Sequence, residues 1–336
     1  MNRRIFLSTL AAAATSARAA NEDDLDFSQL IQPVPLDAKF IDERYYIWCG
    51  APIQSEDGRY HLFYSRWPRE LGHNAWVTRS EIAHAVSDRP LGPYRHRDVA
   101  LPARSPEFWD GACTHNPNII RVGKQYCLFY MGNTGDGKLM KELNYSHRNH
   151  QRIGVAIADR PEGPWQRFDH PALDANPEKG SFDSLMVSNP GAAPRPEGGV
   201  LLVYKGVIDD GSPHGGRVRY GVATSKTAAG PYVRHPGTIF EANDGGKEWM
   251  LAEDPTSGAA RIATGPSRAM SSAASVAPTE AWPSSNRATA LIGSPPAIPK
   301  CSTITSPGLT ARAVELRSNV PRYSSKKEFP SPCSAP

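Results

Sequence analysis

Three acidic residues hold the same place relative to three polar strand starts. Each stands six residues before a second polar residue, and the pairs are Asp110 with Asn116, Asp183 with Asn189, and Glu248 with Asp254. Two carboxyl groups that face each other across a cleft can cleave an acetal, because one protonates the leaving oxygen while the other activates water or attacks carbon. Neighbouring carboxylates also push their pKa values apart, which keeps one of them protonated. Singly, such aspartates often cap turns, but their repetition favours chemistry.

These residues belong to units that repeat along the chain. A Gly-Pro-aromatic motif recurs at 92–94, 163–165 and 230–232, with spacings of 71 and 67 residues. Upstream of each motif lie two short runs with the alternation of strands, the earlier of which ends in a tyrosine. We expect the aromatic residues of the motif to pack between neighbouring units; they are Tyr94, Trp165 and Tyr232.

A proline marks the start of a further strand in each unit. The dipeptides are Ala51-Pro52, Asn116-Pro117, Asn189-Pro190 and Asp254-Pro255, and the proline spacings are 65, 73 and 65 residues. Three complete units and the opening of a fourth, each with three or four antiparallel strands, predict an all-β propeller, since a sandwich has no reason to repeat at this period. The innermost strands would line a central channel and bring the acidic residues to its mouth.

The strand starts, the Gly-x-Tyr-x-Leu-Phe-Tyr run and the Gly-Pro-aromatic turn resemble the five-bladed β-propeller glycoside hydrolases, particularly family 43 and relatives such as family 117. The resemblance covers about residues 40–255, three blades and part of a fourth. It implies a glycosidase that cleaves O-glycosidic bonds of an oligo- or polysaccharide. The family 43 aspartates of the first two blades do not carry over, because Ala51 and Asn116 stand there. We therefore predict Asp110, Asp183 and Glu253 as the catalytic carboxylates, with Asp110 as base and Glu253 as acid.

Six further residues are predicted to bind the substrate: Arg66, Trp67, His115, Asn116, Asn189 and Asp254. Trp67 or Trp76 could stack on a sugar ring and Arg66 could hold hydroxyls or a carboxylate, although packing between blades explains them as well. His115 could bind a sugar hydroxyl, act as an acid as the resemblance to family 117 implies, or be an ordinary structural histidine.

The composition changes after Pro255. Residues 256–336 contain 15 Ser, 14 Ala and 11 Pro but only three of the 29 aromatic residues, and no second strand is predicted there. One interpretation is a natural low-complexity tail. We favour a change of reading frame soon after the codon for Pro255, because a propeller needs a closed ring. The predicted domains are a propeller over 20–255 and a tail over 256–336 that does not continue the native fold.

The first 19 residues predict export. Arg3 and Arg4 precede a short apolar stretch that ends at Ala17-Arg18-Ala19, the pattern of a twin-arginine signal, although chance arginines in a helical or disordered start are the alternative. The expected location is the periplasm or the exterior, where disulfides are permitted.

Composition excludes several classes of function. No apolar run reaches about 18 residues, which excludes a membrane span. The 38 basic and 34 acidic residues are interspersed and give a net charge of +4, so we expect no nucleic-acid partner. Five cysteines without CxxC pairs or metal spacing predict no structural zinc and no obligatory disulfide framework. No P-loop, dinucleotide-binding or zinc-protease motif occurs, so we expect no cofactor. The expected partner is a plant or algal saccharide, and the sequence does not determine the oligomeric state. Two alternatives to a glycosidase remain: a non-catalytic carbohydrate-binding propeller and an inactive truncated product.

Overall fold

The computed structural model describes residues 33–239, 253–262, 269–277 and 289–292. All of them belong to one compact unit. The predicted export signal over 1–19, Glu248 and the tail beyond residue 292 lie outside the described residues.

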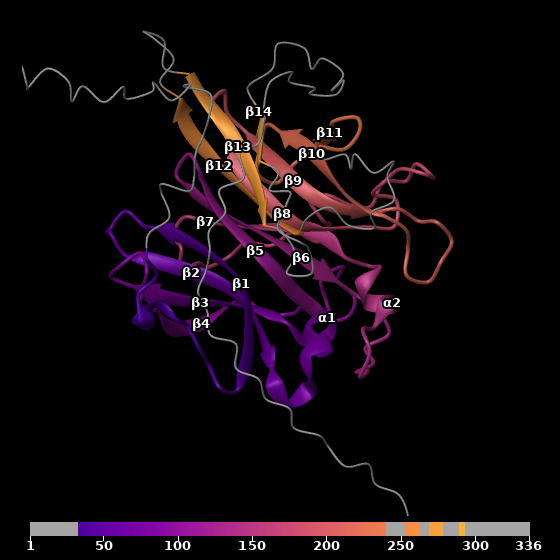
Figure 1. Cartoon of the computed structure of the whole chain (residues 1–336), viewed down its shortest axis with the longest axis horizontal. Coiled ribbons are helices and arrows are strands. Elements are labelled where there is room, and N and C mark those ends of the chain that lie inside the picture. Colours follow the sequence, from indigo (N-terminus) through magenta and orange to yellow (C-terminus); the bar gives the residue numbers. More distant parts are fainter. Residues whose placement is uncertain (1–32, 240–252, 263–268, 278–288, 293–336) are drawn as a thin grey trace, which may run out of the picture. The chain divides into compact units, whose positions relative to one another are not determined.

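The described chain folds into four antiparallel sheets whose strands follow one another in sequence order (Figure 1). The first sheet contains β1 (Tyr45–Gln54), β2 (Tyr60–Pro68), β3 (Glu81–Ser87) and β4 (Arg95–Leu101). The second contains β5 (Cys113–Val122), β6 (Gln125–Asn133) and β7 (Arg152–Ala158), and the third β8 (Met186–Pro194), β9 (Val200–Val207), β10 (Val218–Ser225) and β11 (Val233–Arg234). The fourth contains β12 (Glu253–Ile262), β13 (Ala269–Ala277) and β14 (Thr289–Ile292). Two single-turn helices, α1 (Trp76–Arg79) and α2 (Tyr145–Arg148), and the 3-10 turns Arg69–Leu71 and His73–Ala75 lie in the connections, and a 3-10 turn, Leu36–Ala38, precedes β1.

Neighbouring sheets pack through apolar side chains, as blades of a propeller do. Trp165, which follows β7, meets Phe63 of the first sheet edge to face at 5.5 Å, and Tyr232, which directly precedes β11, meets Phe129 of the second sheet at 6.4 Å. The predicted packing between units is therefore confirmed for these two aromatic residues. The first strands also contact in succession, β1 with β5, β5 with β8 and β8 with β12. These strands are the innermost of their blades.

Each first strand is interrupted by a β-bulge at one equivalent place. The register shifts after Trp48, His115, Ser188 and Glu253. The bulged residues are Cys49, Asn116, Asn189 and Asp254, with φ angles of 52°, 49°, 47° and 51°; in the described part of the chain they are the only residues other than glycine with positive φ. Asn and Asp tolerate this left-handed backbone better than most side chains. In the first sheet the equivalent dipeptide is Cys49-Gly50, so the predicted marker Ala51-Pro52 was misplaced by two residues.

The sheet pattern continues past the point at which the composition changes. β12 pairs with β13 from Glu253 opposite Ala277 onward, and β13 pairs with β14. The prediction that no second strand follows Pro255 was therefore wrong. The fold is all-β, with three blades and a three-stranded fourth sheet.

Candidate functional site

Side chains from four sheets meet at the bulges of the first strands. The amide Nδ2 of Asn116 donates to Asp254 Oδ1 at 3.3 Å and to Cys49 Sγ at 3.0 Å. The amide Nδ2 of Asn189 donates to the same oxygen of Asp254. Residues separated by 65 and 138 positions in sequence thus share one carboxylate. We call Cys49, Asn116, Asn189 and Asp254 the axial cluster.

Local hydrogen bonds orient both asparagines of the axial cluster. Ser188 Oγ donates to Asn189 Oδ1 at 2.6 Å, so the Nδ2 atom of Asn189 is turned toward Asp254. The backbone N–H of Asn116 donates to Ser65 Oγ of β2 at 3.0 Å, which fixes the bulge of β5 against the first sheet. The Asp254 carboxylate is therefore bound by two amides whose positions are fixed by other hydrogen bonds.

The two described hydrogen bonds to the Asp254 carboxylate both end on Oδ1. A carboxylate oriented in this way can take a proton from water or act as a nucleophile. The adjacent Glu253 begins β12, and its side chain lies outside the described residues.

Asp110 is fully buried in a clamp beside the second sheet. Tyr130 donates to Oδ2 at 2.7 Å, Arg104 Nε donates to Oδ1 at 2.7 Å, and Arg167 Nη2 also donates to Oδ2. The ring of Trp109 stacks on Tyr130 with centroids 5.6 Å apart. This carboxylate is thus occupied by two guanidinium groups and a phenol.

Asp183 occupies the same kind of clamp beside the third sheet. Its Oδ2 accepts from Tyr204 and from Arg234 Nε, both at 2.8 Å, and its Oδ1 accepts from Ser181 at 2.6 Å. Burial acts to raise the pKa of Asp183, but the hydrogen bonds from Ser181, Arg234 and Tyr204 together lower it. Among the described contacts, neither clamp aspartate reaches the axial cluster. Asp110 and Asp183 were expected to converge at the channel mouth. Instead, Asp110 binds two arginines and a tyrosine, and Asp183 binds an arginine, a tyrosine and a serine.

The predicted binding residues of the first sheet are buried rather than open to a sugar. Arg66 pairs with Glu81 at 2.8 Å and lies over the ring of Tyr45 at 4.3 Å. Trp67 is 1% exposed and packs against Tyr46. The positions of Arg66 and Trp67 are therefore explained by packing, the alternative to sugar binding that the sequence left open.

His115 lies beneath the aromatic residues of the first sheet and is 4% exposed. Its Nδ1 is 2.7 Å from Ser80 Oγ, and its ring is 5.0 Å from that of Trp76. Burial, together with the charges of Lys205 and His73, lowers the pKa of His115 to about 3. The imidazole is therefore neutral near pH 7, which argues against the acid role implied by the resemblance to family 117.

An exposed aromatic residue beside the axial cluster was missed from sequence. Trp48 precedes Cys49 in β1 and is 52% exposed, and its ring is 5.9 Å from that of His73. An exposed indole presents a flat apolar face on which a sugar ring can stack. Trp48 can be recognised from the sequence only when Cys49 is aligned with the bulged residues of the other first strands.

The described residues give no direct indication of a metal or a membrane span. Among them, no group of three His, Cys, Asp or Glu side chains is placed to hold a metal ion. Within the same residues, no helix is both long enough and apolar enough to cross a membrane. Cys113 and Cys127 are free thiols, while Cys301 and Cys333 lie outside the described part.

No family model matches the sequence, and no curated protein is significantly similar to it. Solved structures are similar in fold. Fructan 1-exohydrolase IIa from Cichorium intybus matches with a TM-score of 0.50 and 16% identity, over 73% of this chain and 43% of that enzyme. A family 117 glycoside hydrolase from Zobellia galactanivorans matches with a TM-score of 0.47 and 18% identity, over 69% and 67%. A thermostable family-43 glycoside hydrolase matches with a TM-score of 0.42 and 13% identity, over 72% and 75%.

These identities establish the fold alone. The chain spans less than half the length of the fructan exohydrolase. The predicted resemblance to five-bladed propeller glycoside hydrolases is confirmed at that level: this chain has a glycosidase-like β-propeller fold.

Proposed function

We propose that this protein is an exported glycoside hydrolase that cleaves O-glycosidic bonds of an oligo- or polysaccharide. The observation that carries the proposal is the carboxylate of Asp254, which amides from the second and third sheets hold within a glycosidase-like propeller. The predicted signal over 1–19 supports export, because polysaccharide substrates occur outside the cytoplasm.

Asp254 acts as the base of this reaction. Its Oδ2 takes a proton from the attacking water while Asn116 and Asn189 keep the carboxylate in place. Glu253 is the proposed acid that protonates the leaving oxygen, as predicted from sequence. Asp110 and Asp183 hold the second and third blades in shape, and Trp48 with His73 supplies a stacking surface for a sugar ring.

A non-catalytic carbohydrate-binding propeller is the second candidate. The observation in its favour is that the axial cluster holds one carboxylate among the described side chains, whereas acetal hydrolysis uses two. Such a protein would use the same amides and the same exposed tryptophan to bind a sugar without cleaving it.

Asp254→Asn tests the assignment on a panel of aryl glycosides and oligosaccharides. We expect kcat to fall about 10²–10⁴-fold, the usual contribution of a positioned base, with little change in KM. Asp88→Asn, a change at an exposed carboxylate after β3, is the matched control and should leave both constants unchanged. Full turnover by Asp254→Asn would overturn the role of Asp254. Sugar affinity without turnover in the unmodified protein would favour the binding propeller.

A further inference from the structure

We propose that an open cavity between the first and second sheets is a subsite for an anionic group of the saccharide, a uronate carboxylate or a sulfate ester, and that Arg79 binds this group. The inference rests on the proposed function, because it names the class of saccharide that the axial cluster would act on. We call this space the Arg79 cavity.

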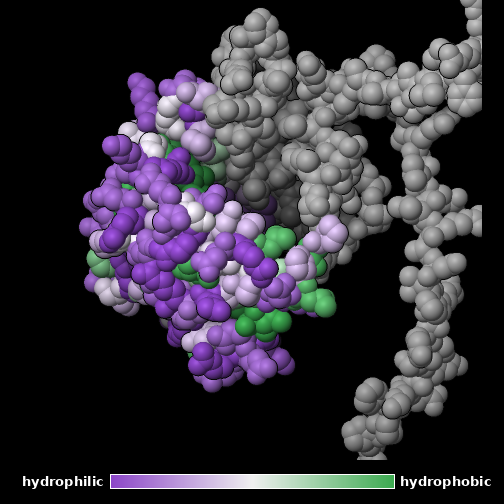
Figure 2. Space-filling view, turned by 90° about the vertical axis from the view of Figure 1, so that its left-hand side faces the viewer, coloured by the Kyte–Doolittle hydropathy of each residue, from purple (hydrophilic) through white to green (hydrophobic). Residues whose placement is uncertain are grey.

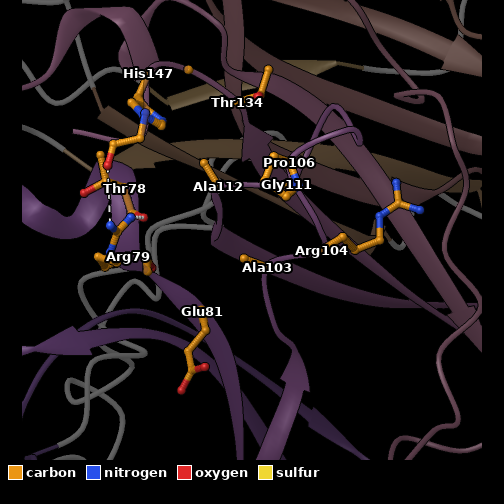
Figure 3. Close-up of a pocket in the computed structure, with 13 residues that line it drawn as sticks. Thr78, Arg79, Glu81, Ala103, Arg104, Pro106, Gly111, Ala112, Thr134 and His147 are labelled. Atoms are coloured by element: carbon orange, nitrogen blue, oxygen red, sulfur yellow. Dashed lines mark hydrogen bonds between the residues drawn. The ribbon is translucent and has the colours of Figure 1, made fainter. Parts of the chain in front are cut away.

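Three segments build the Arg79 cavity, which has a volume of about 480 Å³ (Figure 3). They are residues 78–81 between α1 and β3, the β4–β5 connection, and the β6–β7 connection up to His147 in α2. Saccharide and cofactor pockets commonly have volumes of this order. Gly135 lies in the wall, where a Cβ atom would approach the ring of His147 to 2.6 Å, so the backbone itself forms this side of the cavity.

Arg79 is oriented by carbonyl groups but its charge is not neutralised. Its Nη1 donates to Thr78 O at 2.7 Å and its Nη2 donates to Gly137 O at 3.4 Å. The side chain is exposed, and none of the described carboxylates forms an ion pair with it. A guanidinium has five N–H donors in a planar fork, so donors remain for a carboxylate or a sulfate.

The other charged groups in the wall are already paired. Glu81 forms its ion pair with Arg66, and Arg104 pairs with Asp110 and Asp169. Figure 3 shows the side chains of Glu81 and Arg104 extending away from Arg79. The guanidinium of Arg79 is thus the charge that the cavity offers to a ligand, and it favours an anion.

Among the described residues, the β6–β7 wall forms no ion pair with this guanidinium. His147 is buried and accepts from the Gly137 N–H at 2.9 Å, and burial lowers its pKa, so it is neutral near pH 7. Asp136, which lies behind His147, is occupied by the Lys138 N–H at 3.0 Å and by Asn144 Nδ2 at 2.8 Å. The described contacts of the Asp136 carboxylate are thus with the β6–β7 connection itself, and no ion pair with Arg79 occurs among the described residues.

One hydrogen bond links the Arg79 cavity to the axial cluster. Ser80 lines the cavity, and its Oγ contacts Nδ1 of His115 at 2.7 Å. His115 directly precedes Asn116, which binds Asp254. Through this contact the wall of the Arg79 cavity is joined to β5, the strand that carries Asn116.

Isothermal titration calorimetry with three trisaccharides tests the subsite. The probes are trigalacturonic acid, neutral galactotriose and a sulfated galactotriose, titrated into the full chain and into Arg79→Met. We expect the unmodified protein to bind one of the two anionic probes at least 10-fold more tightly than the neutral one, which also identifies the anion. Arg79→Met should lose this preference, while its affinity for neutral galactotriose stays within 2-fold. Arg95→Met is the matched control at an exposed arginine at the far end of β4 and should keep the preference.

Equal affinity for all three probes, no binding of any probe, or a preference that survives in Arg79→Met would overturn the subsite. A thermal melt of Arg79→Met within about 2 °C of the unmodified protein shows that the exposed substitution leaves the fold intact. The two proposals fail separately. An anionic preference without turnover would refute the hydrolase but keep the subsite, and turnover of neutral substrates without that preference would do the reverse.

Discussion

The first sheet differs from the second and third at the same structural position. In the second and third sheets a tyrosine of the second strand, Tyr130 or Tyr204, donates to a buried aspartate that an arginine also holds. In the first sheet Tyr64 instead meets His96 Nδ1 at 2.9 Å, and Arg66 reaches the other nitrogen of that ring at 3.4 Å. The repeat therefore keeps the tyrosine but changes its partner.

The difference extends to the backbone next to the tyrosine. Gly132 and Gly206 follow their tyrosines by two residues, and an added Cβ would collide with the clamp aspartate in each case. The first sheet has Arg66 at this place, and this arginine pairs with Glu81. A clamp aspartate thus requires a glycine beside it, and without the aspartate the strand can carry a long side chain.

Removal of the clamp aspartates should give the largest effects on stability. Asp110→Ala would leave Arg104 and Arg167 partly buried without their carboxylate, and we expect a loss of about 3–5 kcal/mol in the free energy of unfolding. Asp183→Ala releases one arginine and two hydroxyl groups, so its cost should be smaller, about 2–3 kcal/mol. Urea denaturation at pH 7 measures both, with Asp88→Ala as the control at an exposed carboxylate.

The order of the two losses is the critical result. Equal losses, or a larger loss for Asp183→Ala, would contradict the account in which the number of released arginines sets the loss of stability.

The contribution of Asp183 to stability also depends on pH over a defined range. Because its pKa is lowered in the folded protein, this contribution is present above about pH 4 and is lost as the pH falls through the lowered value.

Glycines that touch the clamp aromatic residues should give the next largest effect. A Cβ atom at Gly154 would collide with the ring of Trp109, so Gly154→Ala should cost about 1–3 kcal/mol in overpacking. The equivalent residue in the first sheet is Ala83, which pairs with Tyr64, and there Phe40 meets the Tyr64 ring edge on, with an interplanar angle of 84°. Ala83→Gly should cost only about 0.5–1 kcal/mol through backbone entropy. Urea denaturation measures both losses. Similar losses for the two variants would show that the Trp109 ring is not the reason for a glycine at position 154.

The exposed surface of the first sheet differs as well. β1 is largely half-buried or exposed along its length, whereas nearly all of β8 is buried. The surface in Figure 2 is mostly hydrophilic with a few separate hydrophobic patches. The inner strand of a blade is covered when sheets pack on both of its sides, and β8 contacts both β5 and β12.

Local periodicity explains how much of this arrangement could be predicted from sequence. The strand runs were predicted from local alternation, and the packing of Trp165 and Tyr232 was predicted from the repeat of the Gly-Pro-aromatic motif. Asn116, Asn189 and Asp254 were predicted as binding residues at strand starts, but their meeting on one carboxylate was not predicted. Cys49 was missed because the bulge in the first sheet carries glycine where the others carry proline. The clamp of Asp110 was missed because Arg167, which holds it, lies 57 residues later in the chain.

A pair of buried histidines in the first sheet should give the smallest effect at pH 7. His61 Nδ1 is 2.8 Å from His84 Nε2, and His84 Nδ1 is 3.2 Å from Asp98 Oδ1. The third sheet has Leu201 and Val222 at these two positions. His61→Leu with His84→Val removes both partners and should change the free energy of unfolding by about 1 kcal/mol or less, whereas His84→Val alone leaves a buried nitrogen without its partner and should cost about 1–3 kcal/mol.

Acid should separate the double variant from the unmodified protein. Burial lowers the pKa of both histidines to about 4, below the value of about 6.5 in an unfolded chain. The unfolded chain therefore binds more protons between these values, so the stability that depends on the neutral pair is present above pH 6.5 and is lost as the pH falls toward 4. Asp57, Arg59, Arg97 and Asp98, the charged groups that act on the pair, are unchanged in the variant. Thermal melts from pH 7 to pH 4.5 should thus fall more steeply for the unmodified protein, and parallel curves would show that the histidines do not set the acid sensitivity of the first sheet.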